Sequence, residues 1–288
     1  MPPPLFIFIA TISLSLVSAK LSCVGDGGDE VDFFIILKIP KVGEYMYLDS
    51  KNTTFRKSPH NLSSGDSAND AVSTTLAQIY SDFKSSSGFV MYNDQDPDGT
   101  NHESRAHSKG VAGLDTEQGF WMIHSVPSFP NAVIDGYEPC CTNGLKYGQS
   151  FLCLTLPPAA FNRMGCLGRI NWPHRIDSFV PEMLRERYPD FSNFADGGED
   201  RDAQIASTWI ETVGGRSFEV FAKSGRWGGD LYDDLIAPGL GVNLQVSTWQ
   251  NGVRGAMGLF YPTDHRSYTV VNVVTQERND TAWKESQE

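Results

Sequence analysis

Short runs of consecutive apolar residues constrain the fold of this 288-residue chain more strongly than any other feature of its sequence. Residues 32–40 (DFFIILKIP) are an apolar run that stops at a proline, and residues 88–94 (GFVMYND) read in the same way. Such runs are typical of buried strands. A helix is predicted between them, behind Asp70, because apolar residues recur there at three- and four-residue spacing: Val72, Leu76, Ile79, Tyr80 and Phe83.

The rest of the chain continues this mixture of strands and helices. Residues 107–115 (HSKGVAGLD) and 119–130 (GFWMIHSVPSFP) contain two predicted strands joined by DTEQ. Further elements are predicted at 150–156, 216–224 and 243–250 (strands) and around 230–240 (a helix that Pro238 interrupts). With 40% apolar residues, the chain can bury the core of one large domain or of two closely packed halves. The expected fold class is α+β.

The N-terminal segment has the properties of a secretory signal peptide. Residues 1–19 contain an apolar stretch and end in the small residues Val17-Ser18-Ala19, so we expect cleavage before Lys20. An uncleaved anchor is the alternative, although the stretch is short for a bilayer span. No later segment of the sequence is long and apolar enough to cross a membrane. We therefore expect a secreted or lysosomal protein that has no membrane contact after cleavage.

Entry into an oxidising compartment changes what the cysteines and asparagines predict. The five cysteines fit no metal-ligand spacing and should mostly pair, which leaves one over. Cys140 and Cys141 are adjacent, so they serve different partners or one of them stays free. Acceptor sequons predict glycosylated surface positions at three asparagines: Asn52, Asn61 and Asn279.

The net charge of −12 at pH 7 argues against a constitutive nucleic-acid binder at neutral pH, because 23 Lys and Arg residues are outnumbered by 35 Asp and Glu residues. This objection weakens in acid, where the six histidines become protonated and carboxylates begin to lose their charge. An acidic compartment is therefore where such a surface tolerates DNA.

The spacing of His107 and Lys109 suggests phosphate chemistry. If these residues lie on a strand, their side chains point the same way. A histidine can attack phosphorus while a lysine neutralises the phosphate oxygens, and a second histidine must then protonate the leaving alcohol. The plain alternative is that the pair forms a solvated strand edge, and that His124 is a hydrogen-bonded histidine in an apolar strand. The hairpin register bears on this, because pairing of Leu114 with Gly119 sets His124 opposite Lys109, whereas a one-residue shift turns it to the other face.

Several long segments together resemble the deoxyribonuclease II family of acid endonucleases. The resemblance runs in order from Leu21 to about Trp249, and weakly to the end of the sequence. The segments that carry it are LSCVGDGGDEVDFFIILKIP, YNDQ, HSKGV, GFWMIHSVPSFP, YGQSFLCLTLP and FAKSGRWGGDLYDDLIAPGLGVNLQVSTW. That family is similar to the phospholipase D superfamily, which implies a pseudo-dimer of two mixed α/β halves with central β-sheets.

The resemblance also implies which residues act. Each half of such a pseudo-dimer contributes one H-x-K motif, and DNA is cut without metal or other cofactor to leave 3′-phosphates. The implied halves are residues 20–165 and 166–288. His107 and Lys109 match the first H-x-K, with Lys109 binding phosphate, and His124 matches the histidine of the family's W-x-x-H-S segment. Position 114 is Leu where phospholipase D motifs carry Asp. Cys23 and Cys153 match the family's N-terminal disulfide.

One departure concerns the second half. The family's second H-x-K is expected after residues 279–288 (NDTAWKESQE), where this sequence stops, so we expect an incomplete C-terminal half. His265 in DHRSY is the nearest substitute, but it lies too early and is expected to be a loop histidine. Three further histidines have no motif support: His60, His102 and His174. The segment WPHRID, which contains His174, is expected to form a loop at the boundary between the halves.

Three functions remain open from the sequence. The first is a metal-independent acid endodeoxyribonuclease that uses His107, Lys109 and His124, with its missing histidine supplied by residues beyond Glu288 or by a second chain in a homodimer. The second is a catalytically silent secreted relative that binds DNA or a host protein. The third is a phosphodiesterase that acts on a non-nucleic substrate such as a phospholipid.

Overall fold

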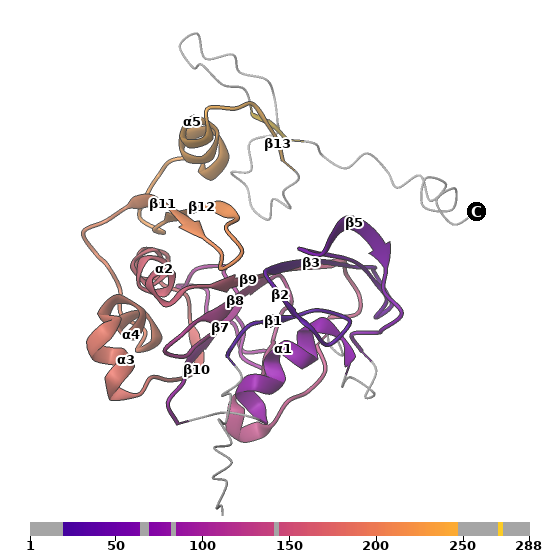
Figure 1. The fold of residues 1–288 in the computed structure, drawn as a ribbon. Helices are drawn as coiled ribbons and strands as arrows, with labels where there is room; N and C mark the ends of the chain where they lie inside the picture. Colours follow the sequence, from indigo (N-terminus) through magenta and orange to yellow (C-terminus); the bar gives the residue numbers. More distant parts are fainter. Residues whose placement is uncertain (1–19, 64–68, 82–84, 141–143, 247–269, 273–288) are drawn as a thin grey trace, which may run out of the picture.

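The protein is a mixed α+β structure built around one large antiparallel sheet, shown in Figure 1. The computed structural model describes residues 20–63, 69–81, 85–140, 144–246 and 270–272. The strands of the sheet lie in the order β10 (Arg175–Phe179), β6 (Gly88–Tyr92), β7 (Gly110–Leu114), β8 (Gly119–His124), β9 (Gln149–Leu156), β3 (Phe33–Lys38), β4 (Tyr45–Asp49) and β5 (Asn52–Lys57). Every neighbouring pair is antiparallel.

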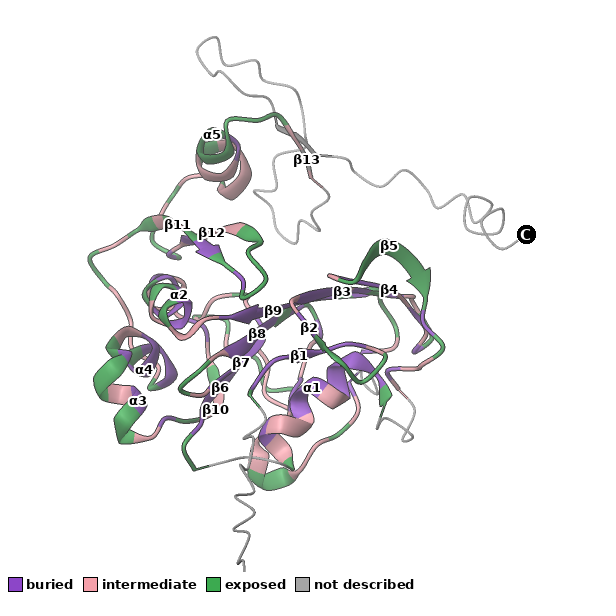
Figure 2. Cartoon of the chain, in the orientation of Figure 1, coloured by how far each residue is buried: buried purple, intermediate pink, exposed green. Residues whose placement is uncertain are grey.

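Helices cover both faces of the sheet, which explains the continuous apolar runs in the sequence. One face packs against α1 (Ala71–Tyr80), and the other against α2 (Pro158–Asn171), α3 (Glu182–Arg187) and α4 (Pro189–Ala195) (Figure 1). Successive strand residues point to opposite faces. Neighbours such as Trp121 and Met122 therefore belong to different core clusters, and both are buried. Figure 2 shows this burial along the central strands, whereas the edge strand β5 is exposed.

Most predicted elements are present. Strands β3, β6 and β9 confirm the apolar runs, and β12 (Ser217–Lys223) confirms the run at 216–224. Helix α1 begins behind Asp70, whose carboxylate accepts hydrogen bonds from the backbone N–H groups of Val72 (3.0 Å) and Ser73 (2.9 Å). Hairpin β7–β8 pairs Leu114 with Gly119, so the register that sets His124 opposite Lys109 is the one adopted.

Other expectations need correction. The segment 172–177 is not all loop, because β10 begins at Arg175 and pairs with β6 at the edge of the sheet. The helix around 230–240 is a π-helical turn, η3 (Leu231–Ile236), that continues into α5 (Ala237–Leu240), so Pro238 lies in the first turn of α5 rather than interrupting a helix. Of the strand expected at 243–250, the structure describes β13 (Leu244–Val246), which pairs with β14 (Val270–Asn272).

The remaining elements lie around the sheet. Two short strands, β1 (Cys23–Val24) and β2 (Glu30–Val31), pair near α1. A separate hairpin of β11 (Ile205–Glu211) and β12 packs on α2. A 3₁₀ turn, η2, spans Val133–Asp135. The predicted boundary between residues 165 and 166 falls inside α2, so the division into two halves stays a prediction. Among the described helices, none has both the length and the apolar character needed to cross a bilayer.

The structure describes the predicted disulfide and two of the three predicted glycosylation sites. Cys23 and Cys153 form the disulfide that the family resemblance implies, with their Cα atoms 6.0 Å apart. Asn52 is exposed at the start of β5, and Asn61 is partly buried. The signal segment 1–19, Cys141, His265 and Asn279 lie outside the described residues.

Candidate functional site

The candidate site forms where the loop after β6 meets the segment that leads into β7. Asp94 follows β6 and places its two carboxylate oxygens against two different partners. Its Oδ2 contacts Nδ1 of His107, and its Oδ1 accepts a hydrogen bond from Nζ of Lys109. A single carboxylate therefore holds both members of the H-x-K motif.

The strand assumed for this motif begins later than predicted. Strand β7 starts at Gly110, so His107 and Lys109 lie in the segment before it and strand alternation does not align their side chains. Their shared contact with Asp94 brings them together instead. Asp94 was not among the site residues predicted from the sequence, although it lies in the YNDQ segment that carries part of the family resemblance.

The three side chains differ sharply in exposure. His107 is 88% exposed, Asp94 16% and Lys109 6%, so the imidazole faces solvent while the ammonium lies behind it. Partial burial alone would raise the pKa of the Asp94 carboxyl, but its hydrogen bond and charge interaction with Lys109, followed by those with His107, hold this pKa below its usual range. Asp94 is thus an anion whose two oxygens engage an ammonium and an imidazole.

His124 lies at the end of β8, across the hairpin from Lys109. Its backbone N–H donates to the carbonyl oxygen of Lys109 at 3.2 Å, and its ring packs against Phe129 and Phe151. Nδ1 accepts a hydrogen bond from the backbone N–H of Val126 at 3.2 Å, which leaves the ring proton on Nε2. Among the described residues, Nε2 has no hydrogen-bond partner.

The electrostatic environment of His124 keeps its imidazole neutral. Complete burial, and then the nearby Lys109 charge, lower the pKa of His124 to about 3. Even in mildly acidic solution this ring is therefore uncharged. A neutral, enclosed histidine can orient its neighbours, but it is poorly suited to donate a proton to a leaving group near pH 5.

Asn93 connects the two parts of the site. Its side-chain Nδ2 donates to the carbonyl oxygens of Val126 (3.0 Å) and Phe129 (2.7 Å), in the segment that follows β8. Asn93 is fully buried and directly precedes Asp94. This amide therefore sets the position of the Asp94 backbone relative to the segment that holds His124, a role with no signal in the sequence beyond its place in YNDQ.

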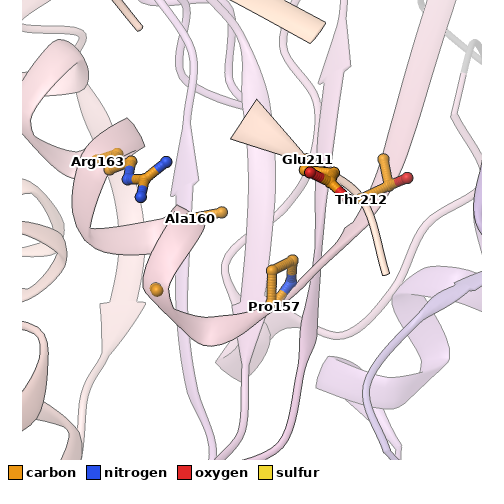
Figure 3. Close-up of a pocket in the computed structure, with 6 residues that line it drawn as sticks. Pro157, Ala160, Arg163, Glu211 and Thr212 are labelled. Carbon is orange, nitrogen blue, oxygen red and sulfur yellow. The ribbon is translucent and has the colours of Figure 1, made fainter. Parts of the chain in front are cut away.

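The side chains of the other described histidines have different partners. Nε2 of His60 lies 3.2 Å from the carbonyl oxygen of Asp26, whereas His102 and His174 both contact Asp96. In the described part of the chain, Asp96, His102 and His174 bring together donor atoms that could hold a metal ion. Figure 3 shows a separate pocket between the start of α2 and the end of β11, lined by Pro157, Ala159, Ala160, Arg163, Glu211 and Thr212. None of the site residues contributes to that pocket.

Comparison with known proteins identifies the family of the chain. The model of the family described as Deoxyribonuclease II matches residues 22–288. Deoxyribonuclease-2-alpha of Rattus norvegicus is 33% identical over 265 residues, which cover 87% of this chain and 75% of the rat protein. Cell-death-related nuclease 7 of Caenorhabditis elegans is 30% identical, with 86% and 68% covered, and Plancitoxin-1 of Acanthaster planci is 31% identical, with 87% and 74% covered. The chain therefore belongs to the deoxyribonuclease II family.

Proposed function

We propose that this protein is a secreted or lysosomal acid endodeoxyribonuclease that cleaves DNA without a metal ion and leaves 3′-phosphates. One observation carries the proposal: Asp94 engages Nδ1 of an exposed His107 and, through its other oxygen, the ammonium of Lys109. With the Nδ1 proton directed at a carboxylate, the lone pair on Nε2 is available to a phosphodiester in solvent.

In the proposed reaction, Nε2 of His107 attacks phosphorus and the bond to the 5′ oxygen breaks. A second histidine donates a proton to that oxygen, because one imidazole cannot act from both sides of the phosphate. Water then hydrolyses the phosphorus–nitrogen bond and releases the 3′-phosphate. The Lys109 ammonium stabilises the extra negative charge on phosphate.

The second histidine is the open element of this mechanism. The burial and low pKa of His124 support an orienting role rather than proton donation. We infer that the donor comes from a second H-x-K motif, as expected for the pseudo-dimer of residues 20–165 and 166–288, or from His107 of a second chain in a homodimer. In the latter case, specific activity should rise with protein concentration as dimer forms.

The test is cleavage of plasmid DNA at pH 5 in EDTA. We expect endonucleolytic cleavage with 3′-phosphate ends, and a loss of at least about a hundredfold in His107→Ala. His60→Ala is the matched control, because His60 is a histidine outside the site, and it should cleave like the unmodified protein. EDTA-resistant cleavage that persists in His107→Ala would show that this histidine is only an exposed loop side chain.

A second candidate is a silent family member that binds DNA or a host protein. The burial and low pKa of His124 favour it, because the mechanism needs a second histidine that can donate a proton. Retention of DNA at pH 5 without any cleavage, in a correctly folded sample, would support this candidate over the nuclease. The phosphodiesterase alternative predicts hydrolysis of a phospholipid in the same assay.

The proposed compartment has its own test. A secreted product that begins at Lys20 and loses mass on enzymatic deglycosylation is expected from the signal segment and the sequons. Asn52 is the most accessible acceptor that the structure describes, so Asn52→Gln should remove one glycan. A full-length, unglycosylated cytosolic protein would contradict the proposal.

A further inference from the structure

A second cluster of donor atoms lies beside the Asp94 loop. Nε2 of His102 is 2.7 Å from Oδ2 of Asp96, and Nε2 of His174 is 2.9 Å from Oδ1 of the same carboxylate. The three ligand atoms all lie within 4.8 Å of one another, and the side chains are 23% to 31% exposed. The two imidazole rings stack with their centroids 3.4 Å apart and their planes at 15°.

From this geometry we propose that Asp96, His102 and His174 form a binding site for one divalent transition-metal ion such as Zn²⁺. Two imidazole nitrogens and one carboxylate oxygen are a donor set that Zn²⁺ uses, with a fourth position left for water. Bonds of about 2.0–2.1 Å place the ligands of a tetrahedral ion roughly 3.3 Å apart. That spacing lies between the nitrogen–oxygen contacts of 2.7 and 2.9 Å and the 4.8 Å within which all three ligand atoms lie. The ion would replace the protons through which the two rings now contact Asp96.

The surrounding backbone holds the ligands in place. The N–H of Asp96 donates to the carbonyl oxygen of Thr100 at 2.9 Å, which closes the turn between Asp96 and His102. The segment that carries His174 is joined to the first by a bridge between Ala106 and Pro173 and by the Arg105 guanidinium, which lies 3.5 Å from the centre of the Trp172 ring. Two loops that are distant in the sequence are thereby tied together next to the cluster, so little ordering is needed on binding.

The proposed ion would brace the loop that carries the Asp94 carboxylate. The N–H of His102 donates to the carbonyl oxygen of Asp94 at 2.8 Å, and the carbonyl oxygen of His174 accepts from the N–H of Asn93 at 3.0 Å. Both ligands thus hold the backbone at residues 93 and 94 directly. No step of the proposed reaction uses this ion, and its binding does not depend on whether the protein cuts DNA.

The test is metal binding by the full chain at pH 7, where imidazole ligands are available in their neutral form. After EDTA treatment and removal of the chelator, calorimetric titration with Zn²⁺ should show one equivalent bound, and Co²⁺ should produce visible absorption bands typical of a site with nitrogen and oxygen ligands. His102→Gln and His174→Gln should each weaken Zn²⁺ binding at least about tenfold and remove the Co²⁺ bands.

Controls distinguish this site from other histidines. His60→Gln removes an imidazole elsewhere, and His107→Gln removes the one beside Asp94, so both should bind Zn²⁺ like the unmodified protein. Circular dichroism checks the fold of each variant, and Asp96→Asn, which keeps the size of the side chain, gives a second route if a histidine variant unfolds. The absence of Co²⁺ bands in the unmodified protein, undiminished binding in folded Asp96→Asn and histidine variants, or loss of binding in His107→Gln would each overturn the proposal.

Discussion

Asp94 joins the two charged residues of the candidate site, and its environment explains why each of them stays in place. Its carboxylate is the counter-charge for an ammonium that is only 6% exposed, and it also holds one nitrogen of a histidine that is almost fully exposed. A buried lysine without such a partner would be strongly destabilised. The same contact therefore serves stability through Lys109 and chemistry through His107.

This dependence predicts a large energetic coupling between Asp94 and Lys109. Asp94→Asn leaves the buried ammonium without a counter-charge, so we expect a loss of about 3 kcal/mol in the free energy of unfolding. Lys109→Met removes the charge and keeps the length of the side chain. Adding it to Asp94→Asn should recover part of the loss, with a coupling of roughly 1–3 kcal/mol in urea unfolding. Strictly additive effects would show that the two groups do not interact.

His124 predicts a specific dependence of stability on pH. Its pKa is about 3 in the folded protein and about 6.5 in an unfolded chain, so only the unfolded state gains a proton between these values. Its contribution is fully present above pH 6.5, is lost as the pH falls toward 3, and amounts to about 2 kcal/mol of lost stability by pH 5.

The variant His124→Asn tests this contribution. The asparagine oxygen can accept the Val126 N–H as Nδ1 of His124 does, but it does not titrate. Urea unfolding at pH 7 and pH 5 should therefore show a smaller difference between the two pH values in the variant than in the unmodified protein. Equal differences would mean that His124 is not held neutral by burial.

At the scale of elements, the packing of α2 against α4 depends on glycine. A Cβ atom on Gly165 would lie 2.5 Å from the backbone nitrogen of Phe191 and 2.6 Å from the carbonyl carbon of Asp190. Gly168 approaches the ring of Phe194 in the same way. These contacts are with backbone and with a buried ring, so neither helix can move aside without disturbing the core on this face of the sheet.

Gly165→Ala should therefore destabilise the protein by about 1–3 kcal/mol through overpacking, although alanine is the better helix former. Gly27→Ala is the matched control, because among the described residues no atom lies within 4 Å of the added Cβ, and it should change stability by less than about 0.5 kcal/mol. Thermal and urea unfolding of the two variants make the comparison. A neutral Gly165→Ala would show that α2 and α4 are not in close contact.

At the scale of the whole molecule, one covalent link spans much of the chain. The disulfide between Cys23 and Cys153 joins β1 to a central strand of the sheet across a sequence separation of 130 residues. Both sulfur-bearing residues are fully buried in the core cluster beneath α1. The link holds the start of the described chain against β9, a central strand of the sheet.

Removing this link should lower stability strongly. For a closed loop of this length, the chain-entropy model gives roughly 4–5 kcal/mol, so the double variant Cys23→Ala/Cys153→Ala should unfold at a much lower urea concentration. Peptide mapping under non-reducing conditions checks the pairing itself. A free Cys23 thiol in the oxidised protein, or an unchanged urea midpoint in the double variant, would contradict the assignment.

Local patterns were enough to predict a substantial part of this structure. Residues 33–36 of β3 are all apolar because both faces of this strand are covered, and the Asp70 cap with its spaced apolar residues marks α1 within a single segment. Helix α2 was missed because its close-packed glycines weaken the helical signal, and β5 because an exposed edge strand carries no apolar alternation. Long ordered motifs were enough to predict the family, and with it the disulfide.

The arrangement of the polar groups depended on the path of the chain in space. Asp94 reaches His107 through a loop, and His174 lies 78 residues from Asp96 yet shares its carboxylate because β10 pairs with β6 at the edge of the sheet. Periodicity reports which face of an element is buried, since that depends on neighbours within a few residues. It carries no information about which loops meet, because strand order and loop paths bring together residues that no local pattern relates.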